Sequence, residues 1–131
     1  MVLKSSLYES EPWGFETENL FLNQAIAIES VLAPYDLLKE LLTIEAELGR
    51  KRKENHVGYE SRPIDLDIIY YDDIINDDED LTLPHPRLHQ RRFVLTPLCE
   101  ISPDFIHPVF KVSNKVLLER CEDELGVRVV K

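Results

Sequence analysis

Two aspartates, Asp65 and Asp67, are separated by a single residue within the apolar stretch from Ile64 to Tyr71. In a strand, residues two apart project from the same face, so these two carboxylates are expected to lie side by side. Oxygen ligands on a rigid strand suit Mg²⁺, which completes its shell with water and substrate phosphates. The alternative is an acidic edge that faces solvent, and the pair alone does not decide between the two.

Basic residues are concentrated around this aspartate pair, although the chain carries a net charge of −10. Eight of the 15 lysines and arginines fall between positions 50 and 92, namely Arg50, Lys51, Arg52, Lys53, Arg62, Arg87, Arg91 and Arg92. Arginine grips phosphate oxygens with two parallel hydrogen bonds. Carboxylates for a metal and arginines for phosphate predict a phosphoryl-type transfer. The alternative, that Arg50 to Lys53 complement a helix C-terminus, accounts for only one or two of them.

Three further side chains could contact a ligand. His85 stands between Pro84 and Pro86, near the arginines, and could donate to a phosphate oxygen. Phe21 and Asn23 are expected on one strand face, where an amide beside an aromatic ring could bind a flat heterocycle; the alternative is a core phenylalanine and a polar edge. The other histidines (His56, His89 and His107) are interpreted as surface or loop residues. No glycine-rich P-loop occurs, so a nucleotide would be bound in another way.

The composition predicts one soluble domain over residues 1–131, with 44% hydrophobic and 31% charged residues. The acidic balance argues against binding to nucleic acid or to anionic membranes. Cys99 and Cys121 show no metal-binding spacing, which indicates a reduced, cytoplasmic chain. No apolar run approaches the length of a membrane span.

The elements that must position these residues follow from periodicity and from glycine and proline. Extended segments are expected at 3–8, 21–31 and 64–71, the first two as an antiparallel pair. Helices are expected from Pro34 to a C-terminal cap at Gly49, over 91–100 and over 113–121. The pattern is typical of an α+β fold.

Several segments together resemble the 6-hydroxymethyl-7,8-dihydropterin pyrophosphokinase family of folate biosynthesis. They are Ser6 to Gly14, Phe21-Leu22-Asn23, Arg62-Pro63-Ile64-Asp65-Leu66-Asp67, Leu81 to Arg87 and Arg91 to Leu98. The resemblance implies a ferredoxin-like sandwich of an antiparallel sheet and helices. It also implies an enzyme that transfers diphosphate from ATP to the hydroxymethyl group of the pterin and releases AMP.

The same resemblance implies residue roles. Asp65 and Asp67 would bind two Mg²⁺ ions and, with Arg52 and Arg62, form the catalytic group. The nucleotide would be bound by Arg50, Arg52, Arg62, Thr82, His85 and Arg91. The pterin would be bound by Ser10, Glu11, Trp13, Phe21, Asn23 and Phe93. Glu45 matches a family position on the helix beside the site.

Two departures from the family pattern stand out. Glu60-Ser61 replaces the small pair that usually precedes the Arg62 motif. Family members also carry a strand, a turn and a helix of about twenty-five residues ahead of the segment that starts here. The chain is therefore expected to be N-terminally truncated and to form a homo-oligomer that fills the missing strand. The alternatives are a non-catalytic relic or binding module, or another Mg²⁺-dependent nucleotidyl or phosphoryl transferase.

Overall fold

A computed structural model of the chain describes residues 2–10, 21–55, 64–124 and 126–130, without the side chains of residues 50–55. The chain divides into two compact units. The first unit comprises residues 1–29 and 86–131, and the second comprises Ser30–His85. Helices and antiparallel strands confirm the predicted α+β class. The single domain over 1–131 stays a prediction.

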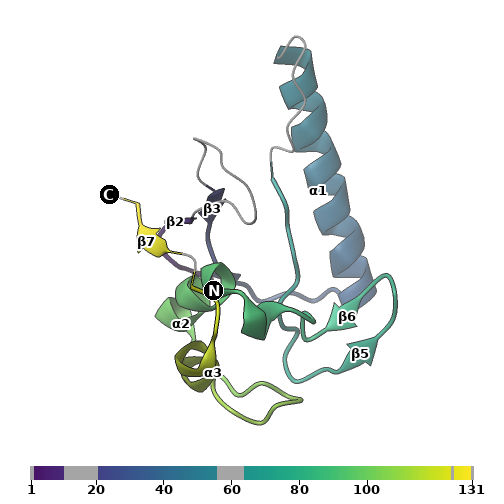
Figure 1. The fold of residues 1–131 in the computed structure, drawn as a ribbon. Helices are drawn as coiled ribbons and strands as arrows, with labels where there is room; N and C mark the ends of the chain where they lie inside the picture. Colours follow the sequence, from purple (N-terminus) through teal and green to yellow (C-terminus); the bar gives the residue numbers. More distant parts are fainter. Residues whose placement is uncertain (1, 11–20, 56–63, 125, 131) are drawn as a thin grey trace. The chain divides into compact units, whose positions relative to one another are not determined.

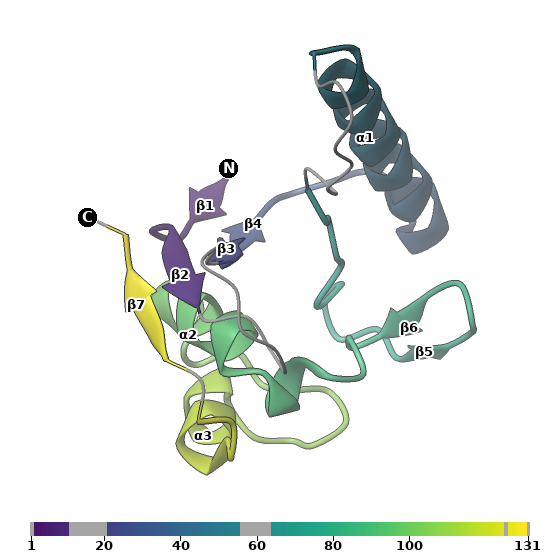
Figure 2. The same cartoon turned by 45° about the horizontal axis from the view of Figure 1, so that its top comes forward.

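Short antiparallel strands form the sheets of the first unit (Figure 1). β2 (Tyr8–Ser10) is the central strand between β3 (Phe21–Asn23) and β7 (Val127–Val129), and Figure 2 shows β7 alongside β2. β1 (Leu3–Lys4) pairs with β4 (Ile26–Ala27). These pairings confirm the predicted antiparallel arrangement of the N-terminal segments.

The predicted strand over 21–31 is interrupted between β3 and β4, and Ser5 explains the interruption. The buried Ser5 hydroxyl accepts a hydrogen bond from the N–H of Ala25 at 2.9 Å, while the Gln24 side-chain amide donates to the Ser5 carbonyl at 2.7 Å. Side-chain hydrogen bonds thus replace part of the regular ladder. Alternation of apolar residues alone does not reveal such a break.

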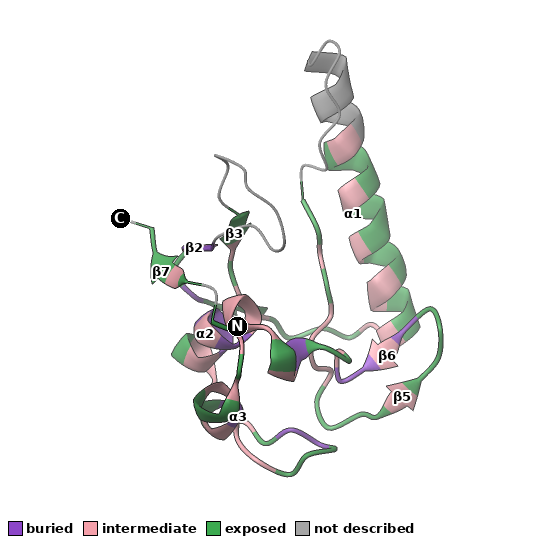
Figure 3. Cartoon of the chain, viewed as in Figure 1, coloured by how far each residue is buried: buried purple, intermediate pink, exposed green. Residues whose placement is uncertain are grey.

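Three helices complete the first unit: η1 (Leu88–Gln90), α2 (Arg92–Ile101) and α3 (Asn114–Arg120). α2 covers the face of the sheet on which Tyr8 and Ser10 are buried, and α3 packs against α2. Figure 3 shows the buried positions of α2 in purple. The Ser113 hydroxyl caps α3 by accepting from the N–H of Val116 at 3.2 Å. The two predicted C-terminal helices are confirmed to within a residue at each end.

The second unit contains α1 (Pro34–Asn55), with Pro34 at its first position as predicted. The predicted C-terminal cap at Gly49 is wrong, because the helix continues through this glycine. A glycine costs about 1 kcal/mol inside a helix but does not end it when good helix formers follow, as Arg50, Lys51 and Arg52 do here. No helix among the described residues is long and apolar enough to cross a membrane.

The predicted strand over 64–71 is also wrong, because these residues belong to no strand of the structure. A strand is defined by its ladder, and no neighbouring strand pairs with this segment in the described part of the chain. A hairpin that the sequence did not reveal follows it, formed by β5 (Asn76–Asp77) and β6 (Thr82–Leu83). The N–H of His85 then donates to the carbonyl of Ile69 at 2.9 Å, so the hairpin returns beside the segment with the aspartates.

Candidate active site

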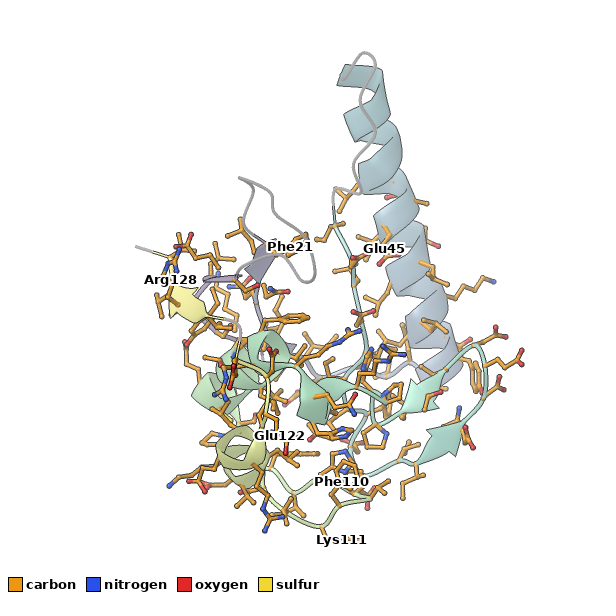
Figure 4. The ribbon with its side chains drawn as sticks, viewed as in Figure 1. Phe21, Glu45, Phe110, Lys111, Glu122 and Arg128 are labelled. Carbon is orange, nitrogen blue, oxygen red and sulfur yellow. The ribbon has the colours of Figure 1, made fainter. Side chains whose placement is uncertain are left out.

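The aspartate pair lies on the segment 64–71, and both side chains are exposed. The residue between them is fixed by α1, because the Leu66 N–H donates to Oε2 of Glu45 at 2.6 Å. Figure 4 shows Glu45 on α1 beside this segment. A hydrogen bond to a carboxylate is among the stronger ones in proteins. Glu45 therefore holds the backbone from which both aspartates project.

These two carboxylates have the chemistry of a partial magnesium site. Among the described residues no group of three or more His, Cys, Asp or Glu side chains is arranged to hold a metal. Mg²⁺ commonly takes one or two protein carboxylates and completes its shell with water and substrate phosphates. The residues present therefore fit a magnesium ion that arrives with a nucleotide.

Thr82 and His85 belong to the same unit as the aspartates. The Thr82 hydroxyl donates to the carbonyl of Asp78 at 3.0 Å and closes the acidic turn of the hairpin. In that turn the pKa of Asp78 is lowered, chiefly by the N–H of Asp80 and then by the hydroxyl of Tyr35. Thr82 is thus carried by a hydrogen-bonded turn, and His85 follows β6, where its N–H donates to the Ile69 carbonyl.

The predicted pterin-binding residues Ser10, Phe21 and Asn23 lie in the sheet of the first unit. The register places Phe21 opposite Ser10 and Asn23 opposite Tyr8, so Phe21 and Asn23 share a face. Phe21 is 51% exposed, which disfavours the alternative of a core phenylalanine. The Nδ2 donor of Asn23 is buried and has no hydrogen-bond partner among the described residues.

Arg91 and Phe93 lie at the start of α2. The guanidinium carbon of Arg91 is 5.7 Å from the centroid of the Phe93 ring, within range of a cation–π contact. A residue assigned to the nucleotide and a residue assigned to the pterin are therefore neighbours in the first unit.

The remaining predicted site residues lie outside the description. They are Glu11, Trp13 and Arg62, with the side chains of Arg50 and Arg52. The roles of all the site residues stay predictions.

The Arg92 side chain binds the backbone that follows α3 in the first unit. Its Nε donates to the carbonyl of Asp123 at 2.8 Å, and its terminal nitrogen donates to the carbonyl of Cys121 at 3.0 Å. Its backbone N–H donates to Oδ2 of Asp123 at 3.0 Å. These partners follow α3, where no spacing in the sequence pointed to them.

His107 lies in a loop, as the sequence suggested, but it is buried rather than at the surface, because it is only 3% exposed. Its Nδ1 accepts the N–H groups of Val109 and Phe110 at 3.1 and 3.0 Å, and its ring stacks on Phe110. Burial, and then the nearby His89, lower the pKa of His107. Pro108, which follows it, is a residue type that favours a turn.

A second contact that the sequence did not reveal joins the N-terminal segment to α2. The Tyr8 hydroxyl donates to Oε1 of Glu100 at 2.6 Å, and the N–H of Ser6 donates to Oε2 at 2.9 Å. The hydrogen bond to Glu100, with burial, raises the pKa of Tyr8 to about 12. The same bonds lower the pKa of Glu100. The contact anchors β2, which carries Ser10.

Comparison with known proteins decides the family. The family model described as 7,8-dihydro-6-hydroxymethylpterin-pyrophosphokinase matches residues 1–103. The chain belongs to this family. The resemblance drawn from the Arg62, Asp65 and Asp67 motif is therefore confirmed.

Curated relatives of this pyrophosphokinase family agree with the match. A 2-amino-4-hydroxy-6-hydroxymethyldihydropteridine pyrophosphokinase of Porphyromonas gingivalis is 45% identical over 111 residues, covering 84% of this chain and 75% of that protein. The pyrophosphokinase of Aquifex aeolicus is 39% identical over 111 residues, covering 85% of this chain and 68% of that protein. The folic acid synthesis protein fol1 of Pneumocystis carinii is 43% identical over 123 residues, covering 93% of this chain but only 16% of that protein.

Proposed function

We propose that this chain transfers diphosphate from ATP to the hydroxymethyl group of 6-hydroxymethyl-7,8-dihydropterin. In this reaction the substrate oxygen forms a bond to the β-phosphorus of ATP, the bond between that phosphorus and the α,β-bridging oxygen breaks, and AMP leaves. The hydroxyl proton is lost as the new bond forms. The family match over residues 1–103 carries this proposal.

The proposed nucleotide-binding residues suit this chemistry. Two exposed carboxylates, Asp65 and Asp67, would hold Mg²⁺, and two ions are proposed because the resemblance to the family implies them. Bound Mg²⁺ would neutralise the negative charge on the transferred diphosphate group. Glu45 holds the backbone between the ligands, while His85, Thr82, Arg50, Arg52, Arg62 and Arg91 are proposed to bind and orient the phosphates.

The pterin residues of the first unit suit a flat, hydrogen-bonding heterocycle. The unpaired Asn23 donor supports this proposal, because a buried amide without a partner costs about 1–3 kcal/mol unless a ligand satisfies it. The half-exposed Phe21 ring and Phe93 are proposed to stack against the pterin. Ser10, Glu11 and Trp13 are proposed to close the pocket.

One assay separates this function from the alternatives. The chain is mixed with Mg²⁺, ATP and hydroxymethyl-dihydropterin, and the nucleotide products are separated by chromatography. Formation of AMP with pterin diphosphate is expected. Nucleotide binding without AMP would instead support a relic or binding module, and formation of ADP would support a different phosphoryl transferase. Because both substrates are small soluble metabolites, the cytoplasm is the proposed location.

A further inference from the structure

The start of α2 carries Arg91 and Phe93 but has no cap of its own. Arg91 occupies the N-cap position, and its side chain makes no capping hydrogen bond. Helix N-termini expose backbone N–H groups that need acceptors. Here the N–H of Arg92, the first residue of the helix, donates to Oδ2 of Asp123 at 3.0 Å. Asp123 therefore caps α2 from a segment 31 residues away.

The side chain of Arg92 also binds the segment that contains Asp123. Its guanidinium donates to the carbonyls of Asp123 and Cys121 at 2.8 and 3.0 Å. Cys121 is the C-cap of α3, where exposed carbonyls favour a positive charge. Three hydrogen bonds therefore join the first residue of α2 to the end of α3. We call these contacts the Arg92–Asp123 clamp.

The clamp fixes the residues on either side of Arg92. The Arg91 carbonyl accepts the N–H groups of Val94 and Leu95, both at 3.0 Å, so Arg91 follows the first turn of α2. Phe93 lies within that same turn. A shift in the first turn of α2 would therefore move the Arg91 guanidinium and the Phe93 ring together.

We infer that Arg92 and Asp123 are positioning residues for diphosphate transfer, acting through Arg91 on the nucleotide and through Phe93 on the pterin. The inference rests on the proposed function. Both residues lie apart from the motif around the aspartates, and Asp123 lies beyond the region that the family model matches. A misplacement of about 1 Å far from the reacting atoms costs up to about 100-fold in rate.

The test compares four single variants of the clamp, and the double variant Arg92→Ala/Asp123→Ala, with one control. Arg92→Ala and Arg92→Lys remove or weaken the guanidinium fork, Asp123→Ala removes the cap, and Asp123→Asn keeps an acceptor for the Arg92 N–H. The control, Arg128→Ala, breaks the Arg128–Glu9 ion pair of 2.6 Å, whose arginine side chain is 58% exposed. Figure 4 shows Arg128 on β7.

Rates of AMP formation are measured over a range of ATP and pterin concentrations, at a temperature where circular dichroism shows each variant folded. Arg92→Ala and Asp123→Ala are expected to raise both KM values and lower kcat, with a combined loss in kcat/KM of about 10- to 100-fold. Asp123→Asn is expected to retain most of the activity, and Arg92→Lys to fall between. The double variant is expected to lose no more than either alanine variant, because both break one clamp.

Unchanged kcat and KM in folded Arg92→Ala would overturn the inference, as would an equal loss in Arg128→Ala. If the unmodified chain forms no AMP, the proposed function fails by itself. Calorimetric titration with a non-hydrolysable ATP analogue and with the pterin then tests the clamp. Weaker binding of both ligands to Arg92→Ala supports it, and equal binding by the variant or absence of binding by the unmodified chain overturns it.

Discussion

The carboxylate of Glu45 accepts a hydrogen bond from the backbone N–H of Leu66, with 2.6 Å between Oε2 and the nitrogen. Glu45→Ala is expected to weaken Mg²⁺-dependent nucleotide binding by about 1.5–3 kcal/mol, the scale of a hydrogen bond to a charged group. Glu45→Gln keeps an acceptor and should lose less. Calorimetric titration with an ATP analogue measures both, and Glu47→Ala on the same helix is the control. An effect of Glu47→Ala as large as that of Glu45→Ala would contradict a specific role.

Asp65 and Asp67 are exposed, so their replacement is expected to change ligand binding rather than the fold. Asp65→Asn or Asp67→Asn should reduce nucleotide affinity in the presence of Mg²⁺ by at least about 100-fold. Loss of a residue that only supports a metal ligand costs up to about 100-fold in metal affinity, and loss of a ligand itself should cost at least as much. Asp73→Asn, in the following turn, is the matched control. A clear fall in the melting temperature of either ligand variant would indicate a structural role for the pair.

Asn23 and Gln24 provide a reciprocal test of the pterin site. Asn23→Leu removes a buried donor that has no partner in the described part of the chain. The free energy of unfolding should therefore change by less than about 1 kcal/mol, while pterin affinity falls at least tenfold. Gln24→Leu removes the hydrogen bond to the Ser5 carbonyl, so stability should fall by about 1 kcal/mol with little change in pterin affinity. Urea unfolding and fluorescence titration measure the two effects. Equal pterin affinity in Asn23→Leu would remove Asn23 from the site.

The burial of His107 predicts that the stability of the first unit decreases at acidic pH. Its pKa is lowered from 6.5 in the folded chain, by burial and by His89, so the unfolded chain takes up a proton first as the pH falls. Its contribution to stability is thus present above pH 6.5 and is lost as the pH falls through the folded pKa. The urea midpoint should decrease from pH 7.5 to pH 5.5. In His107→Asn, whose amide oxygen still accepts from Val109 and Phe110, that decrease should be smaller, whereas His89→Asn should keep most of it.

The segment 64–71 supports the predicted self-association of this chain. It has apolar residues at alternating positions, as a strand does, yet it belongs to no strand among the described residues, so we expect it to pair with a second copy of this chain. Light scattering after size exclusion should give about twice the 15.3 kDa mass of one chain. Ile64→Lys should shift the equilibrium toward monomer by placing a charge on this segment, and Ile75→Lys, immediately before β5, should not. A stable monomer at micromolar concentration would refute the prediction.

Local sequence signals identified the helices and the family, but not the contacts that hold the site. Proline and serine marked the starts of α1 and α3, and alternation placed Phe21 and Asn23 on one face. Periodicity failed over 64–71, because a strand depends on a neighbour that the segment's own residues do not specify. Gly49 misled for a related reason, since glycine ends a helix only where the surrounding chain requires a left-handed residue.

Side-chain partners far apart in sequence were beyond such reasoning. Glu100 is 92 residues from Tyr8, and no sequence pattern around either residue predicts that the two form a hydrogen bond. Arg92 carries the same charge as Arg91 beside it, so composition assigned both to phosphate. Only the packing of α3 against α2 brings the carbonyls of Cys121 and Asp123 to Arg92.

The pairing of β2 with β7 has a consequence for synthesis on the ribosome. Glu9 and Arg128, which join the two strands, are 119 residues apart, so the central strand waits for one partner until almost the whole chain has been translated. At bacterial and eukaryotic elongation rates of about 5–20 residues per second, this delay is roughly 6–24 s. The hairpin of β5 and β6 has no such delay, because both of its strands emerge within a few residues of each other. The nascent first unit therefore stays open to chaperones and proteases for seconds after the second has been synthesised.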